Sequence, residues 1–149
     1  MPILCEVVTQ DRPLFSGEVE AVIAPGAEGQ LGILPHHAPL LTMLGIGLLR
    51  LRLEGREEIF TIGGGFMEVL PDRVTVLAEV GENVAEIDIA RAERARANAE
   101  RLLREVSPQE ADEYARLEAA LRRSNLRLEA ARRFRRGRRG LGGGEGEAG

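Results

Sequence analysis

The sequence contains no lysine and no tryptophan, and it holds a single cysteine. All 20 basic residues are arginines, which excludes a P-loop lysine, a Schiff-base lysine and a lysine general base. Only 3% of the residues are aromatic, so leucine, valine, isoleucine and alanine must build the core. Cys5 has no partner for an internal disulfide, and we expect it to be a buried apolar side chain in a reducing compartment.

Long hydrophobic runs are also missing. The longest apolar stretch, residues 38–49, is too short to cross a bilayer and is interrupted by one proline and two glycines. The N-terminus lacks the basic and apolar regions of a secretory signal. With 44% hydrophobic and 30% charged residues, the composition is typical of a soluble globular protein.

The motifs that would indicate catalysis or metal binding are incomplete. Gly26, Gly29 and Gly32 are spaced like a phosphate loop, but no Gly-Lys-Ser/Thr follows, which favours a glycine-rich strand connection. The only histidines, His36 and His37, are adjacent and would point to opposite faces of a strand. None of the three serines sits in a nucleophile elbow. We therefore expect no catalytic residues and no metal site.

Charge divides the chain into two parts. Residues 1–86 hold five arginines against thirteen acidic residues, a net charge of −8. Residues 87–149 hold fifteen arginines against eleven acidic residues, a net charge of +4. This asymmetry predicts two modules with separate partners.

The first part has the pattern of an antiparallel β-sandwich or barrel over residues 1–86. Short apolar runs alternate with turn signals at Glu54-Gly55 and at Pro71-Asp72, and Gly63 to Gly65 indicates a bulge or tight turn. The expected strands are Ile3 to Val8, Val19 to Ala24, Leu48 to Leu53, Glu58 to Ile62, Phe66 to Leu70 and Val74 to Ala78.

The second part has the pattern of an antiparallel two-helix hairpin over residues 87–136. Small and apolar residues recur at steps of three and four, and Ser107 to Glu110 resembles a capping box that starts the second helix. The seam is narrow and rich in alanine, so we expect the hairpin to open readily. The Gly/Glu-rich tail, residues 137–149, is predicted to be disordered. The seam positions are Ala92, Ala95, Ala99, Leu102 and Val106, then Tyr114, Leu117, Leu121, Ser124, Leu128 and Ala131.

Two surface segments leave alternatives open. The loop from Leu31 to Leu41 is either held by its prolines or serves as an apolar docking surface. The segment from Arg132 to Arg139 concentrates six arginines around Phe134. It is a solvated helix end, or it binds an acidic protein surface or nucleic acid.

Three segments together resemble the epsilon subunits of F-type ATP synthases. They are Glu28 to Thr42, Gly63 to Val69 and Val74 to Glu79, which follow the family's order and spacing. The resemblance covers residues 3–130, nearly the whole chain. It implies an α+β protein with an N-terminal β-sandwich and a C-terminal helical hairpin, and a non-catalytic rotor subunit.

The resemblance also implies partners and a location. The sandwich of the family binds the gamma subunit and rests on the membrane ring of c subunits, and the helices reach the alpha and beta subunits. In this sequence the ring-facing loop corresponds to Glu28, Gln30, Leu31 and His37, and Gln30 stands where many relatives carry a carboxylate. The implied location is the cytoplasmic side of the cell membrane, peripherally and only through the complex. No nucleic-acid partner is implied.

Some members of the family bind ATP, which is the only ligand implied. Their motif is matched by Ile87 to Ala92, which holds Asp88 and Arg91, and the basic positions by Arg123 and Arg127. Glu82 also matches, whereas Asn98 replaces an arginine of the known binders, so we expect weak binding. The alternative is that Asp88 caps the first helix and Arg91 makes a surface pair.

The resemblance implies that the helices inhibit ATP hydrolysis when they extend. Arg122, Arg123 and Arg127 are the positions expected to meet an acidic segment of a catalytic subunit. Two other classes of protein compete with this interpretation. A small hydrolase requires a nucleophile and base, and an RNA-binding adaptor requires aromatic stacking residues, which are scarce here.

Overall fold

A computed structural model describes the backbone of residues 2–107 and 109–145, and the side chains of this set up to residue 135. The chain divides into two compact units, Met1–Asn83 and Val84–Gly149. This division falls slightly before the boundary expected after residue 86. No helix in the described part of the chain has the length and apolar composition that crossing a membrane requires.

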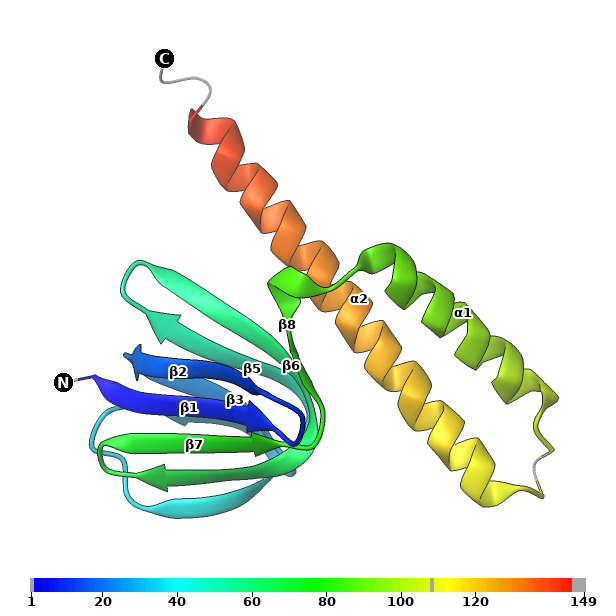
Figure 1. Cartoon of the computed structure of the whole chain (residues 1–149), viewed down its shortest axis with the longest axis horizontal. Coiled ribbons are helices and arrows are strands. Elements are labelled where there is room, and N and C mark those ends of the chain that lie inside the picture. The colour runs from blue at the N-terminus through cyan, green and yellow to red at the C-terminus, as the bar shows by residue number, and fades with distance from the viewer. Residues whose placement is uncertain (1, 108, 146–149) are drawn as a thin grey trace. The chain divides into compact units, whose positions relative to one another are not determined.

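The first unit is a β-sandwich whose layers are joined by long strands. The strand order is β2-β1-β7-β6-β5-β3-β4, and β8 also pairs with β6. All pairs are antiparallel except β1 with β7. Strands β5 and β6 curve from one layer into the other (Figure 1). The strands are β1 (Ile3–Thr9), β2 (Pro13–Val19), β3 (Ala21–Gly26), β4 (Gly29–Ile33), β5 (Leu40–Leu53), β6 (Arg56–Leu70), β7 (Arg73–Ala78) and β8 (Gly81–Asn83).

Three predicted connections between strands are confirmed. Leu53 pairs with Arg56, so Glu54-Gly55 closes the β5–β6 hairpin, and Gly55 supplies the positive φ of 73°. Leu70 pairs with Arg73 across Pro71-Asp72. The glycine-rich segment after residue 25 is the β3–β4 hairpin, in which Gly26 pairs with Gly29. The turn residues therefore fix the strand pairing.

The strand predictions miss β2, β4, β8 and the first half of β5, and they divide β6 into two strands. Strand β2 was not predicted, because its sequence lacks a clear alternation of apolar residues. Strand β6 is continuous where two strands were expected, because Gly63 to Gly65 lies inside it. Gly64 and Gly65 have φ values of 84° and 118°, and a Cβ at Gly65 would overlap the carbonyl oxygen of Leu77. The glycines therefore let the strand bend without ending it.

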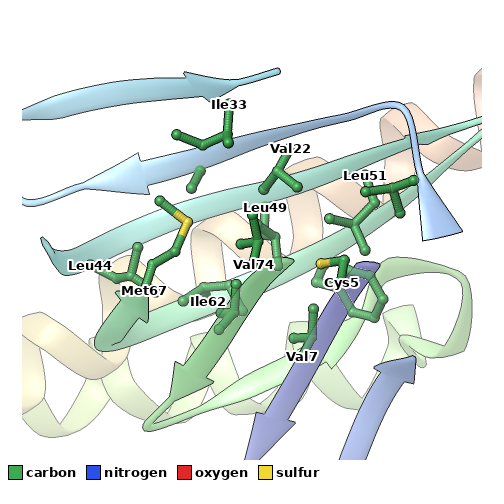
Figure 2. Close-up of a cluster of buried hydrophobic side chains, with 14 of the residues drawn as sticks. Cys5, Val7, Val22, Ile33, Leu44, Leu49, Leu51, Ile62, Met67 and Val74 are labelled. Carbon is green, nitrogen blue, oxygen red and sulfur yellow. The ribbon is translucent and has the colours of Figure 1, made fainter. Parts of the chain in front are cut away.

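The core of the sandwich lies between the two layers and follows the alternation of the strands. The expected burial of Cys5 is confirmed, since its side chain is 0% exposed. Figure 2 shows its sulfur among the aliphatic side chains of this interior. Burial, with a smaller contribution from the charge of Glu6, raises the pKa of Cys5 to about 12. Buried alternating residues include Cys5, Val7, Met67, Val69, Val74 and Val76.

The second unit consists of a short 3-10 helix, η1 (Val84–Glu86), and two α-helices, α1 (Ile89–Glu105) and α2 (Ala111–Glu145). The α-helices lie side by side in opposite directions, and α2 also contacts η1 (Figure 1). The predicted seam is narrow, because only some of its positions are buried. These are Ala92, Ala99, Ser124, Leu128 and Ala131.

The helix ends show one confirmed and one wrong prediction. Asp88 is the N-cap of α1, and its Oδ1 accepts a hydrogen bond from the Arg91 backbone N–H at 3.1 Å. Ser107 does not cap α2. Its Oγ accepts from the Gln109 N–H, which closes a local turn, and Glu110 accepts the first helical hydrogen bond, from the Tyr114 N–H.

The end of α2 runs past the predicted hairpin. Its backbone is helical through Glu145, the last residue whose backbone is described. An existing helix extends by one hydrogen bond per residue without a new nucleation step. Pro108, which belongs to the expected capping box from Ser107 to Glu110, and residues 146–149 lie outside the described residues.

Candidate functional site

An exposed row of apolar side chains crosses four strands of the sandwich. Met43 on β5 pairs with Phe66 on β6, Phe66 pairs with Leu77 on β7, and Leu77 pairs with Val8 on β1. Directly paired residues project from the same face of a sheet, so these four form one continuous line, which we call the apolar row. Met43, Phe66 and Leu77 are 60%, 48% and 52% exposed.

The apolar row lies on the solvent side because the opposite face of its strands forms the core. The sequence neighbours Met67, Val76 and Val7 are buried in the core. Side chains alternate between the faces of a strand, so the residues beside them must face outward. Isolated exposed apolar residues are common, but an aligned line of large ones is typical of an interaction surface.

A hollow of about 590 Å³ lies at the edge of this face. It is lined by the β3–β4 hairpin and by the beginning of β5, and Met43 belongs to both the hollow and the apolar row. Leu41, another lining residue, is 70% exposed. Three of the four residues expected to face a membrane ring gather here, namely Glu28, Gln30 and Leu31.

The fourth predicted ring-facing residue, His37, does not line this hollow. Its Nδ1 donates a hydrogen bond to the Ala38 carbonyl at 2.8 Å. The backbone of His36 has a positive φ of 64°, and its N–H donates to the Pro71 carbonyl at 3.0 Å. These contacts hold part of the predicted apolar loop, while Leu31 and Leu41 belong to β4 and β5. No cluster of three or more potential metal ligands occurs among the described residues.

The residues predicted to bind ATP are divided between the two units. Glu82 lies on β8 of the first unit, and the other four lie on the second. The Asp88 carboxylate already caps α1. Arg123 and Arg127 are one turn apart on α2 and are both half-buried. Because no ligand tests these positions, the ATP site stays a prediction.

The second unit presents its arginines in two ways. Arg122 is exposed, whereas Arg123 and Arg127 are partly covered. Several arginines form ion pairs within one helix, such as Arg96 with Glu100 and Arg133 with Glu129. Arg132 instead connects the helices, since its Nη2 lies 2.5 Å from Oε1 of Glu93. Part of the positive charge of α2 is thus paired with carboxylates of the same unit.

The apolar row was not predicted from the sequence as a functional surface. The sequence does contain a sign of this surface, because Phe66-Met67 and Val76-Leu77 are pairs of neighbouring apolar residues. A strand with one face in solvent usually alternates apolar and polar residues. The register of the strands is needed to show that the outward residues of these pairs, Phe66 and Leu77, lie opposite each other. The glycine-rich hairpin was predicted as a connection, and the structure adds that it walls the hollow.

Comparison with protein families identifies both units. Residues 3–84 match the model of the ATP synthase delta/epsilon chain beta-sandwich domain. Residues 85–132 match the model of the ATP synthase delta/epsilon chain long alpha-helix domain. The two matches follow one another along the chain and meet next to the boundary between the units.

Individual relatives agree with these matches. The ATP synthase epsilon chain of Herpetosiphon aurantiacus is 49% identical over 132 residues, which cover 89% of this chain and 96% of the relative. That of Dehalococcoides mccartyi strain BAV1 is 45% identical over 137 residues, which cover 88% and 93%. A chain in the cryo-EM structure of the Euglena gracilis mitochondrial ATP synthase, OSCP/F1/c-ring, superimposes with a TM-score of 0.72 at 28% identity, covering 87% of this chain and 81% of that one.

Proposed function

Because the chain belongs to the ATP synthase delta/epsilon chain family, we propose that it is a non-catalytic subunit of the rotor in a membrane-bound ATP synthase. In this role it joins the gamma subunit to the ring of c subunits, so that rotation driven by proton flow reaches the alpha and beta subunits that make ATP. It sits peripherally on the cytoplasmic side of the cell membrane. The sandwich makes the contacts to the gamma subunit and the c-ring, and the helical pair regulates ATP hydrolysis.

The apolar row is the observation that carries this proposal. A surface line of large apolar side chains is favourable only when a partner covers it. We assign this line to the gamma subunit, because a permanent partner requires a large and partly apolar contact. Its central residues, Phe66 and Leu77, belong to the row but do not line the hollow, so they are the positions at which to test this contact.

We assign the hollow to the c-ring. Its lining combines the exposed Leu41 and the partly buried Leu31 with the polar Glu28 and Gln30. Such a mixture suits the polar loops of a membrane protein better than a continuous apolar partner. Gln30 is neutral, so Glu28 supplies the charge of this edge.

Binding to purified gamma subunit tests the assignment of the apolar row. We expect Phe66→Ser with Leu77→Ser to weaken binding about tenfold to hundredfold, the effect of losing residues at the centre of an interface. Leu34→Ser is the matched control, because Leu34 is 63% exposed and lies outside the row. All three positions are exposed, so circular dichroism should show folded variants. If the double variant and the control bind equally well, gamma docks elsewhere.

The helical pair is the proposed brake on ATP hydrolysis. Its seam has few buried side chains, and an acidic surface of a catalytic subunit could hold α2 in an extended form through Arg122, Arg123 and Arg127. Deleting residues 87–149 should then raise hydrolysis by the assembled enzyme, while proton-coupled synthesis persists. Replacing the three arginines by alanine should give part of this increase.

Salt separates this brake from a structural role. Contacts between exposed charges are screened over about 8 Å at physiological ionic strength, so inhibition by the wild-type chain should weaken as salt is added. The enzyme lacking residues 87–149 provides the baseline at each salt concentration. Hydrolysis that is the same with and without these residues throughout the series would show that the helical pair is not a brake.

ATP is the proposed regulatory ligand of the helical pair. In the present conformation Asp88 is occupied as a cap, and Asn98 Oδ1 accepts a hydrogen bond from Arg101 at 2.7 Å. We therefore expect weak binding by the isolated chain, with Asn98→Arg tightening it. Losing one charged hydrogen bond weakens binding by about tenfold to hundredfold. Calorimetry at millimolar ATP that detects no heat for either form would exclude ATP as the ligand.

A further inference from the structure

Two arginines in the C-terminal half of α2 contact the region where α1 begins. Arg132 Nη2 lies 2.5 Å from Glu93 Oε1, and Arg135 Nη2 donates a hydrogen bond to the Ile87 carbonyl at 2.7 Å. These contacts join residues 39 and 48 positions apart in the chain. The match to the family's helical domain ends at residue 132, so Arg135 lies beyond it.

The Ile87 carbonyl is placed to receive a charged donor. It directly precedes Asp88, the N-cap of α1, and therefore lies outside the hydrogen-bond ladder of that helix. The Ile87 side chain is buried, and its N–H donates to the Val84 carbonyl at 3.3 Å. A guanidinium on this oxygen ties the start of α1 to the C-terminal half of α2 with a charge-assisted hydrogen bond.

Apolar packing alone gives the helical pair a weak seam. The buried residues of α1 are the small Ala92 and Ala99. On α2, Leu117 and Leu121 are only half-buried, whereas Leu128 is 1% exposed. Among the described side chains of α2, burial is therefore deepest between Ser124 and Ala131. Arg132 and Arg135 directly follow this most closely packed part of the seam.

We propose that Arg132 and Arg135 form an intramolecular clasp that holds the helical pair closed. Glu93 and the Ile87 carbonyl are the two acceptors of the clasp. Its regulatory consequence rests on the proposed function of the helices as a brake. Opening the pair releases both guanidinium groups, so the same arginines cannot hold the closed form and meet an acidic partner at one time. The clasp therefore delays inhibition until its contacts are broken.

Hydrogen exchange on the isolated full-length chain tests the clasp directly. In Arg132→Gln with Arg135→Gln, the amides of α1 should exchange roughly tenfold faster or more, as expected for one exposed ion pair plus one charged hydrogen bond. Glutamine keeps a high helix propensity, so the helices themselves are little affected. Exchange in the sandwich should not change, because the contacts lie within the second unit.

Arg133→Gln is the matched control. Arg133 lies on the same turn of α2 and carries the same charge, but its Nη2 pairs with Glu129 of its own helix at 2.9 Å. This variant should exchange like the wild type. If this variant accelerates exchange in α1 as much as the double variant does, the total positive charge of α2 stabilises the pair and the clasp contacts do not. The proposal would then be wrong.

A charge reversal adds a second test. Glu93→Arg should accelerate exchange, and adding Arg132→Glu should restore most of the protection, because the ion pair is rebuilt with its signs exchanged. The acceleration should also shrink at high salt, since Arg132 and Glu93 are 44% and 47% exposed. Failure of the second substitution to restore protection would remove Arg132 from the clasp.

Glu93→Gln distinguishes the clasp from the brake. This variant loosens the clasp but keeps every arginine, so α1 should exchange faster and the assembled enzyme should hydrolyse ATP more slowly than the wild type. Faster exchange with unchanged hydrolysis would confirm the clasp and count against the brake. Unchanged exchange would refute the contribution of Glu93 to the clasp, whatever the hydrolysis rate.

Discussion

The sandwich and the helical pair are stabilised in different ways. The sandwich has a continuous core of fully buried residues from nearly all of its strands, including the ring of Phe60. The helical pair has small buried residues along its seam and depends on polar contacts such as Arg132 with Glu93. Apolar burial stabilises a structure under most solution conditions, whereas exposed ion pairs respond to salt and to competing charges.

This difference matches the proposed division of labour. A unit that transmits rotation has to keep one conformation, and the interdigitated core of the sandwich supports one. A unit that switches needs two conformations that differ by only a few kcal/mol, so that a partner can shift the population. A thin seam with a polar clasp meets this second need. The following predictions test how far the contrast holds.

The largest effect should come from Phe60. Its side chain is 0% exposed and its ring lies edge-on to that of Phe15, with centroids 6.4 Å apart. Phe60→Ala should lower the free energy of unfolding of the sandwich by about 3–5 kcal/mol. Urea denaturation followed by circular dichroism measures this loss. Leu121→Ala on α2 is the comparison and should cost clearly less, because Leu121 is only half-buried.

Gly65 should give the next largest effect. Its φ of 118° is unfavourable for any side chain, and a Cβ there would meet the Leu77 carbonyl. Gly65→Ala should destabilise the sandwich by about 3 kcal/mol through strain and overlap. Gly32→Ala is the control, because nothing lies within 4 Å of its Cβ position. Its effect should stay within about 0.5 kcal/mol, and an equal loss at both positions would disprove the steric argument.

Cys5 should make the sandwich sensitive to alkaline pH. Burial raises the pKa of Cys5 from 9.0 to about 12, so the unfolded chain releases the thiol proton first as pH rises. Stability from this group is complete below pH 9 and should then fall by about 1.4 kcal/mol per pH unit until the folded pKa is reached. Urea titrations between pH 8 and 11 measure the slope.

Cys5→Ala provides the control for this slope. The variant loses some packing at every pH, but the part of the alkaline slope that comes from the thiol should disappear. The absence of lysine removes the most common side chain whose charge changes in this range. A slope that is unchanged in the variant would mean that another group causes the loss.

The smallest effect should be at the cap of α1. Asp88 Oδ1 accepts the Arg91 N–H, and Asp88→Ala should destabilise the helical pair by about 1 kcal/mol. Thermal melting monitored at the helical circular dichroism band measures the change. Asp88→Asn retains an acceptor and should recover most of it. Equal melting temperatures for the wild type and Asp88→Ala would show that the cap contributes nothing.

Much of this fold could be predicted from local sequence signals. The hairpins at Glu54-Gly55 and Pro71-Asp72 and the cap at Asp88 each depend on residues close together in the chain. The second helix was placed too early because Ser107 makes a turn with Gln109, an alternative that has the same sequence signature as a cap. Strand β2 has no such local signal and is defined by its pairing with β1.

The surfaces were less predictable than the fold. The apolar row depends on the register of four strands, and the clasp joins residues almost 50 positions apart. A single sequence does not encode either in a local pattern. The resemblance to a family did place Glu28, Gln30 and Leu31 on one edge, and they share the hollow. The ring, nucleotide and catalytic-head contacts assigned to individual residues stay predictions.

Strands β5 and β6 have a mechanical consequence. They contain 14 and 15 residues, pair at thirteen positions and curve through both layers (Figure 1). Hydrogen bonds between antiparallel strands run perpendicular to the strands. A force along this hairpin therefore acts in shear on many hydrogen bonds at once. The two layers also cannot slide past each other without bending the backbones of β5 and β6. The sandwich should behave as a stiff coupling, and compliance of the rotor should arise outside it.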